Sequence, residues 1–124
     1  MPAHTAHDIH PQFVKAMNAG DLGALVALYE PQGTLVPQPG QMVTGTEAIR
    51  RGLQGFLAMK PTIRIETKHV LQAGDLALLR SQWIIDCTGP DGQPMKMAGS
   101  GTEVARRQAD GTWLLVIDHP FGAD

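Results

Sequence analysis

The sequence predicts an α+β domain in which three N-terminal helices pack against a curved antiparallel sheet. Apolar residues recur with helical spacing in the first half of the chain and alternate with a period of two from Thr62 onward. Asp91-Gly92 and Asp110-Gly111 each separate two apolar runs, a pattern typical of β-hairpins. A chain of 124 residues without a repeat or linker favours one domain, 1–124, with one core.

Three segments of the first half show the helical pattern. Residues 18–21 (Asn-Ala-Gly-Asp) predict the end of one helix and the start of the next, because glycine suits the left-handed position after a helix and aspartate suits an N-cap. The second helix is expected to end near Pro31, and Thr44 or Thr46 is expected to cap the third. The apolar stripes are Ile9, Phe13, Ala16 and Met17; Leu22, Leu25, Val26 and Tyr29; and Ile49, Leu53, Phe56 and Leu57.

Strands dominate the rest of the chain. A short strand is expected at 34–36, and the prolines that follow it predict a loop. Four antiparallel strands are expected at 62–73, 76–88, 95–107 and 112–119. The order is therefore helix, helix, strand, helix and four strands, with residues 1–8 as a flexible N-terminus.

Two-residue turns at both Asp-Gly pairs would place Arg80 opposite Glu103, and Glu103 opposite Asp118. Directly opposed side chains have Cβ atoms about 5 Å apart. Two carboxylates and an arginine would then lie together among Leu78, Met97 and Val116 on the same face. Such a cluster is either a functional site or a charged ladder facing water.

The opposite face of the same strands is also apolar and carries both tryptophans, Trp83 and Trp113. Three short helices cover only one face of such a sheet. The second face therefore predicts a homodimer through the outer sheet face, unless the sheet curls upon itself.

Composition excludes several classes of protein. A net charge of −2 and few aromatic residues disfavour nucleic acid as a partner. One cysteine excludes an intramolecular disulfide, and no apolar run approaches the ~20 residues of a membrane span. The polar N-terminus lacks the apolar core of a signal peptide, so a cytoplasmic protein is expected. No phosphate-binding loop or metal-ligand cluster is seen, and no cofactor or metal is expected, although His4, His7 and His10 have helical spacing.

The motifs at 18–21 (Asn-Ala-Gly-Asp), 45–49 (Gly-Thr-Glu-Ala-Ile) and 110–113 (Asp-Gly-Thr-Trp) carry a resemblance. Over residues 9–121 the chain resembles the nuclear transport factor 2-like superfamily, which includes ketosteroid isomerase and SnoaL-like polyketide cyclases. It looks most like small bacterial proteins of the SnoaL-like or DUF4440 (SgcJ) type. The resemblance implies a cone-shaped, cystatin-like roll around an apolar pocket, usually in a dimer. It also implies cofactor-free acid–base chemistry, ligand binding or scaffolding.

Only part of the isomerase site carries over. Its general base would fall within 35–38 (Leu-Val-Pro-Gln), which has no carboxylate. Its tyrosine donor would fall near Phe13 or Met17, and neither of these side chains can donate a hydrogen bond. Its oxyanion-stabilising acid lies eight residues before the turn glycine, as Glu103 does before Gly111. Steroid isomerisation is therefore not expected.

These observations lead to the hypothesis of a small enzyme that shifts a proton, cyclises or hydrates a small apolar carbonyl compound. Glu103 and Asp118 would share the acid and base roles, with His119 as an alternative base that a one-residue register shift would bring to the same face. The expected substrate-binding residues are Arg80, Tyr29, Met97 and Val116. A structural Arg80–Glu103 ion pair is the alternative for the cluster. A non-catalytic binding or accessory protein, or a dimerising scaffold, is the alternative for the whole chain.

Overall fold

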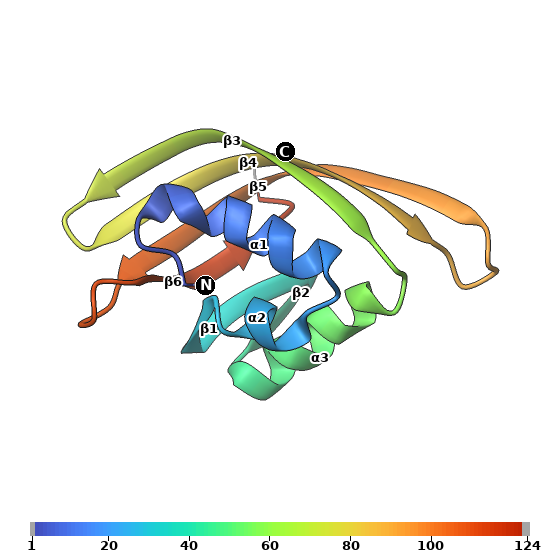
Figure 1. The fold of residues 1–124 in the computed structure, drawn as a ribbon, viewed down its shortest axis with the longest axis horizontal. Helices are drawn as coiled ribbons and strands as arrows, with labels where there is room; N and C mark the ends of the chain where they lie inside the picture. Colours follow the sequence, from blue (N-terminus) through green and yellow to red (C-terminus); the bar gives the residue numbers. More distant parts are fainter. Residues whose placement is uncertain (1, 123–124) are drawn as a thin grey trace.

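The computed structural model describes residues 2–122 and consists of three α-helices beneath one six-stranded sheet (Figure 1). The helices are α1 (Ile9–Asn18), α2 (Leu22–Val26) and α3 (Thr46–Leu57), preceded by a 3-10 turn at Ala6–Asp8. The strands are β1 (Tyr29–Gln38), β2 (Gln41–Thr44), β3 (Thr62–Ala73), β4 (Leu76–Thr88), β5 (Pro94–Arg107) and β6 (Trp113–His119). Within this part of the chain, no helix has the length and apolar character that crossing a bilayer requires.

The sheet has the order β2-β1-β6-β5-β4-β3. The predicted α+β class with a curved sheet is confirmed, but the sheet is mixed and open, because β1 runs parallel to β6. A parallel pair needs a long connection between its strands, and the whole segment from α3 to β5 supplies it here. The short expected strand at 34–36 gave no sign of this pairing.

The second helix and the first strand differ from expectation. Helix α2 ends at Val26, and Tyr29, expected on the apolar stripe of that helix, is the first residue of β1. The register of β1 against β6 shifts between Tyr29 and Thr34. A strand interrupted in this way lacks a clean alternation of apolar and polar residues, and so it resembled a helix end in the sequence. The expected loop after 36 contains a second short strand, β2.

The helices cover the concave face of the sheet, with α1 against β3 and α3 against β1 (Figure 1). Every second side chain of β4 points into this core. Trp83 and Trp113 are both buried there, which corrects the expectation that the tryptophan face lies outside. The core-facing strand residues with the lowest exposure are Leu35, Ile63, Ala77, Leu79, Ile85, Ala105 and Leu115.

The outer, convex face carries the exposed apolar side chains. Leu71 pairs with Leu78, Leu78 with Val104, and Val104 with Ile117, so one apolar row crosses four neighbouring strands. Leu71, Leu78 and Ile117 in this row are exposed, and Val104 is half-buried. We call these four residues the outer row.

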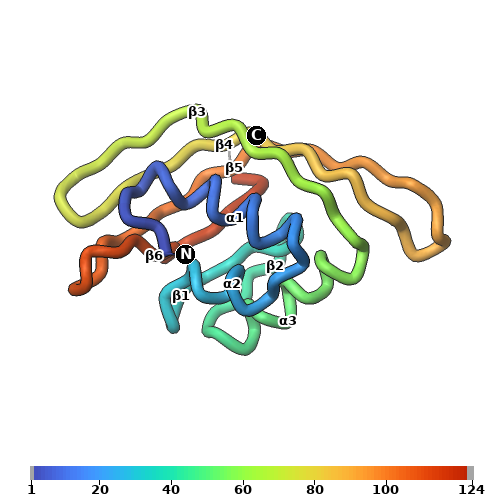
Figure 2. Tube along the Cα trace, viewed as in Figure 1, coloured from blue at the N-terminus to red at the C-terminus, as the bar shows by residue number. Residues whose placement is uncertain are grey.

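Residues 3–8, expected to be flexible, are packed against the sheet. Ala3 and Ala6 are buried, and the Trp113 backbone N–H donates to the Ala3 carbonyl at 2.9 Å. The trace in Figure 2 accordingly brings this segment beside β6 before it enters α1. The N-terminal segment is held by small side chains, which give no apolar pattern in the sequence, and Met1 lies outside the described residues.

Candidate functional site

The hairpin between β4 and β5 has a three-residue loop. Gly89 and Gln93 close it by a backbone hydrogen bond of 2.8 Å, and Gly92 adopts the left-handed conformation (φ 78°) that such loops require. The added loop residue shifts the register by one, so Glu103 pairs with Leu79 and Arg80 pairs with Thr102. The predicted pairing of Arg80 with Glu103 is therefore wrong, and Arg80 lies on the outer face.

The hairpin between β5 and β6 also has a three-residue loop, closed between Gln108 and Thr112. Here a register shift between Val104 and Ala105, opposite Val116, compensates for the extra loop residue. Beyond this bulge Glu103 pairs with Asp118, as predicted. The pairing was correct although the two-residue turn from which it was inferred is wrong.

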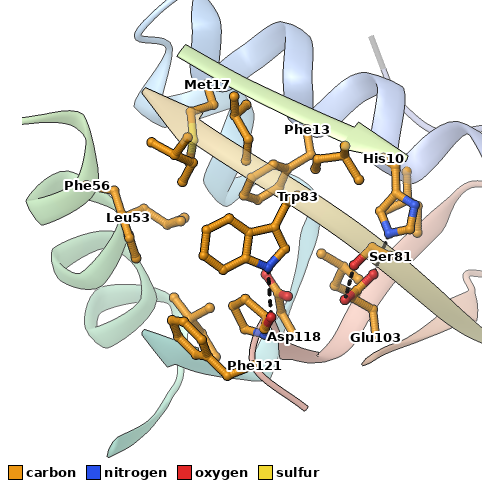
Figure 3. A pocket seen from close by; sticks show the side chains of 17 residues that line it. His10, Phe13, Met17, Leu53, Phe56, Ser81, Trp83, Glu103, Asp118 and Phe121 are labelled. Atoms are coloured by element: carbon orange, nitrogen blue, oxygen red, sulfur yellow. Dashed lines mark hydrogen bonds and ion pairs between the residues drawn. The ribbon is translucent and has the colours of Figure 1, made fainter. Parts of the chain in front are cut away.

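An apolar pocket lies between the helices and the concave face of the sheet (Figure 3). The cavity volume is about 60 Å³, which leaves room for a few water molecules or a small ligand. The polar side chains that line the pocket are His10, Ser81, Glu103 and Asp118. Its apolar lining consists of Ile9, Phe13, Met17, Leu35, Leu53, Phe56, Ile63, Ile65, Trp83, Ile85, Leu115, Pro120 and Phe121.

Glu103 connects the polar side chains at one end of this pocket, because it is hydrogen-bonded to both His10 and Ser81. Its Oε1 is bonded to Nε2 of His10, which α1 contributes, and its Oε2 accepts from the Ser81 hydroxyl at 3.1 Å. Both Glu103 and His10 are 4% exposed. Buried polar groups are tolerated when they are hydrogen-bonded, and both oxygens of this carboxyl group have a hydrogen-bond partner.

Gly101 makes room for this arrangement. A Cβ atom at this position would lie 2.5 Å from Glu103 Oε2 and 2.7 Å from Ser81 Oγ. The position two residues before Glu103, on the same inner face of β5, therefore has to lack a side chain so that the polar groups of Glu103 and Ser81 can both fit there.

Asp118 is the second buried carboxyl group of the site. Its Oδ2 accepts from the Tyr29 hydroxyl at 2.5 Å, and no other side chain among residues 2–122 hydrogen-bonds to it. Burial and, to a smaller extent, the nearby Glu103 carboxyl group together raise the pKa of Asp118 to about 7, against the lowering effects of the Tyr29 hydrogen bond and of His10. Burial, together with Asp118, also raises the pKa of Tyr29 well above its ordinary value.

The segment after β6 closes the pocket beside Trp83. The indole N–H of Trp83 donates to the Pro120 carbonyl at 2.7 Å, and the Phe121 ring meets the indole edge-on with centroids 5.6 Å apart. Figure 3 shows Trp83 and Phe121 side by side in the wall. Gly99 allows this close approach, because a Cβ there would lie 2.6 Å from the indole.

The other predicted site residues lie outside this pocket lining. His119 pairs with Thr102, and so it faces the opposite side of the sheet from Asp118. Val116 lies at the β6 bulge, and Met97, opposite Ile85, packs half-buried against the core. Tyr29 lies behind Asp118 and reaches the site through its hydroxyl.

Sequence reasoning missed His10, Ser81 and Trp83 as pocket residues. His10 precedes Phe13 by three and Met17 by seven, the spacing of one helical face, and this signal was available. His10 was missed because it lies just after residues 1–8, which were expected to be flexible. Within the part of the chain that the structure describes, no three histidine, cysteine or acidic side chains are grouped so that they could hold a metal ion.

Comparisons with solved structures agree with this architecture. A ketosteroid isomerase-like protein from Erwinia carotovora is 22% identical, with a TM-score of 0.79, over 90% of this chain and 88% of that one. A nuclear transport factor 2-like superfamily protein from Salmonella enterica is 16% identical, with a TM-score of 0.79, over 90% of this chain and 84% of that one. A protein with a cystatin-like fold from Novosphingobium aromaticivorans is 17% identical, with a TM-score of 0.74, over 90% of this chain and 75% of that one. These likenesses show the fold.

No curated protein shows significant sequence similarity to this chain. The family model of the SnoaL-like domain, in contrast, matches residues 11–116, which include Glu103 but neither His10 nor Asp118. With its curved sheet, concave pocket and nuclear transport factor 2-like neighbours, the chain belongs to the SnoaL-like domain family.

Proposed function

We propose that this protein is a cofactor-independent acid–base enzyme that isomerises, cyclises or hydrates a small apolar carbonyl compound. The observation that carries the proposal is the pair of opposed carboxyl groups, Glu103 and Asp118, at the polar end of an otherwise apolar pocket. Two neighbouring carboxyl groups with different surroundings separate the roles of acid and base.

The contacts of each carboxyl group suggest its role. Glu103 is oriented by its hydrogen bonds to His10 and Ser81, and we assign it the role of the base that takes a proton from the carbon next to the substrate carbonyl. Asp118, with a pKa raised to about 7, is protonated in about half of the molecules at neutral pH, and these molecules can donate the proton to the carbonyl oxygen. The apolar walls exclude water and strengthen both interactions.

The proposal is tested by proton exchange at carbon. The protein is incubated in deuterated water with a panel of small cyclic ketones, and deuterium incorporation next to the carbonyl is followed by NMR. Glu103→Gln and Asp118→Asn should each lower exchange by a factor of about 10² or more, the contribution of a positioned acid or base. Asp86→Asn, an exposed aspartate on β4, is the matched control and should leave exchange unchanged. Exchange that persists in both site variants would refute the assignment.

A second candidate function is ligand binding without catalysis. It is favoured by the fact that both carboxyl groups are already bonded within the chain, Glu103 to His10 and Asp118 to Tyr29. Ketones that bind in the same NMR samples with no exchange would support this alternative.

We also propose a homodimer formed through the convex face. The outer row presents apolar side chains from four strands, and the two-fold symmetry of most dimers would place this row against its own copy.

A further inference from the structure

His10 is bonded at both ring nitrogens, and its two partners lie in different environments. Nε2 meets the buried Glu103 carboxyl group, while Nδ1 lies 2.7 Å from the hydroxyl of Thr67, which is exposed at the surface. Hydroxyl, imidazole and carboxyl groups therefore form one continuous line from solvent to the end of the pocket. Imidazole can accept a proton at one nitrogen and release one at the other.

Thr67 reaches His10 because it lies on the inner face of the edge strand β3. It pairs with Ser81 and follows Ile63 and Ile65 in the regular alternation of this strand, which places its side chain beside α1 although the residue is exposed. The register with β4 shifts only after Thr67, where Lys68 is the extra residue of a bulge.

We propose that Thr67 and His10 form a proton relay through which the Glu103 carboxyl group exchanges its proton with solvent. In the outward direction Glu103 Oε1 gives its proton to His10 Nε2, and Nδ1 gives its own proton to the Thr67 oxygen. The original hydroxyl proton passes to water. Glu103 is left ionised, and His10 and Thr67 end neutral, with the ring proton moved from Nδ1 to Nε2.

The relay would connect the base at the polar end of the pocket to solvent after a proton abstraction. Ser81 and Asp118, the other acidic or hydroxyl side chains of the described lining, are themselves buried and do not reach the surface. Its use in turnover rests on the proposed function. Its proton exchange, however, can be measured without any substrate.

The test follows the ring N–H signals of His10 in ¹⁵N-labelled protein, with the exchange rate with water measured by saturation transfer at fixed pH. Thr67→Val keeps the shape of the side chain but removes the hydroxyl, and it should slow exchange about tenfold, the effect of losing one hydrogen-bonded step. Thr67→Ser should retain the wild-type rate. Thr62→Val is the control, because Thr62 is an exposed threonine of the same strand that pairs with Asp86 on the outer face.

A Thr67→Val rate equal to that of the wild type, or equal slowing in Thr62→Val, would overturn the relay. The wild type alone gives a second measurement should Thr67→Val not fold. The Ile63 amide donates to Asn18 Oδ1 at 2.7 Å and so exchanges only when α1 separates from β3. The His10 ring proton should exchange faster than this amide, and equal rates would mean exchange by opening of the structure. A functioning relay without ketone turnover would remove the enzyme proposal and leave the relay intact.

Discussion

Glu103 and Asp118 lie directly opposite each other on β5 and β6, yet each is hydrogen-bonded to a side chain from a different element of the fold. Glu103 meets His10 of α1, and Asp118 meets Tyr29 at the start of β1. The two carboxyl groups are 4% and 7% exposed. Their electrostatic interaction therefore acts in a poorly solvated environment, where it separates their protonation behaviour.

The first prediction concerns stability against pH. Because the pKa of Asp118 is about 7 in the folded state and near 3.9 when unfolded, the folded state binds the extra proton between these values. Its contribution to stability is full below about pH 4 and is lost as the pH rises to about 7. Asp118→Asn should remove this loss, so the variant's free energy of unfolding relative to wild type should rise by about 2–3 kcal/mol from pH 5 to pH 8.

Urea denaturation at several pH values measures this difference. Asp86→Asn is again the control, because Asp86 is exposed and should show no such trend. A constant difference between Asp118→Asn and wild type across the range would contradict the raised pKa.

A second prediction isolates Tyr29. Its hydroxyl donates to Asp118 and lowers the pKa of that carboxyl group, so Tyr29→Phe should raise the pKa of Asp118 above its wild-type value of about 7. The loss of the hydrogen bond should also cost about 1–2 kcal/mol of stability. Carbon-13 NMR of the Asp118 carboxyl group follows the titration directly. A pKa that falls would mean that Tyr29 does not act through this hydrogen bond.

Sequence reasoning located the elements well where the apolar period is clean. The 3.6-residue period of α1 and α3 and the alternation in β3 and β4 reflect which side chains enter the core, and these elements were found. It failed at Tyr29, where a short helix leads directly into an irregular strand. Burial of one residue does not distinguish a helix end from a strand start.

The candidate site was predicted only in part, for a similar reason. Strand register depends on loop length, and an Asp-Gly pair occurs in both two- and three-residue loops. One additional loop residue moved Arg80 to the outer face, while the β6 bulge restored the pairing of Glu103 with Asp118. Partners from distant elements, such as His10, cannot be obtained by counting along strands.

The third prediction concerns Gly101. An alanine Cβ would meet Glu103 Oε2, Ser81 Oγ and, at 3.2 Å, the Cα of Pro120. The two oxygens are buried and joined by a hydrogen bond, so neither moves freely. Gly101→Ala should therefore lower the free energy of unfolding by about 1–3 kcal/mol. Gly55→Ala in α3 is the control: no atom lies within 4 Å of its Cβ, and alanine should stabilise the helix by up to ~1 kcal/mol. Thermal unfolding distinguishes the two variants. A Gly101→Ala variant with the stability of the wild type would show that the Glu103 and Ser81 side chains can rearrange around the added methyl group.

The fourth prediction concerns the homodimer. Leu78 is 38% exposed and lies in the middle of the outer row, so a charge there would have to be buried in the proposed interface. Leu78→Glu should therefore dissociate the dimer, because an unpaired buried charge costs several kcal/mol. Met42→Glu changes the most exposed large apolar side chain of the described residues, on β2 and outside the row, and should leave assembly unchanged. Sedimentation velocity at micromolar concentration measures all three proteins. A monomeric wild type, or a Leu78→Glu variant that stays dimeric, would mean that the outer row does not join two subunits.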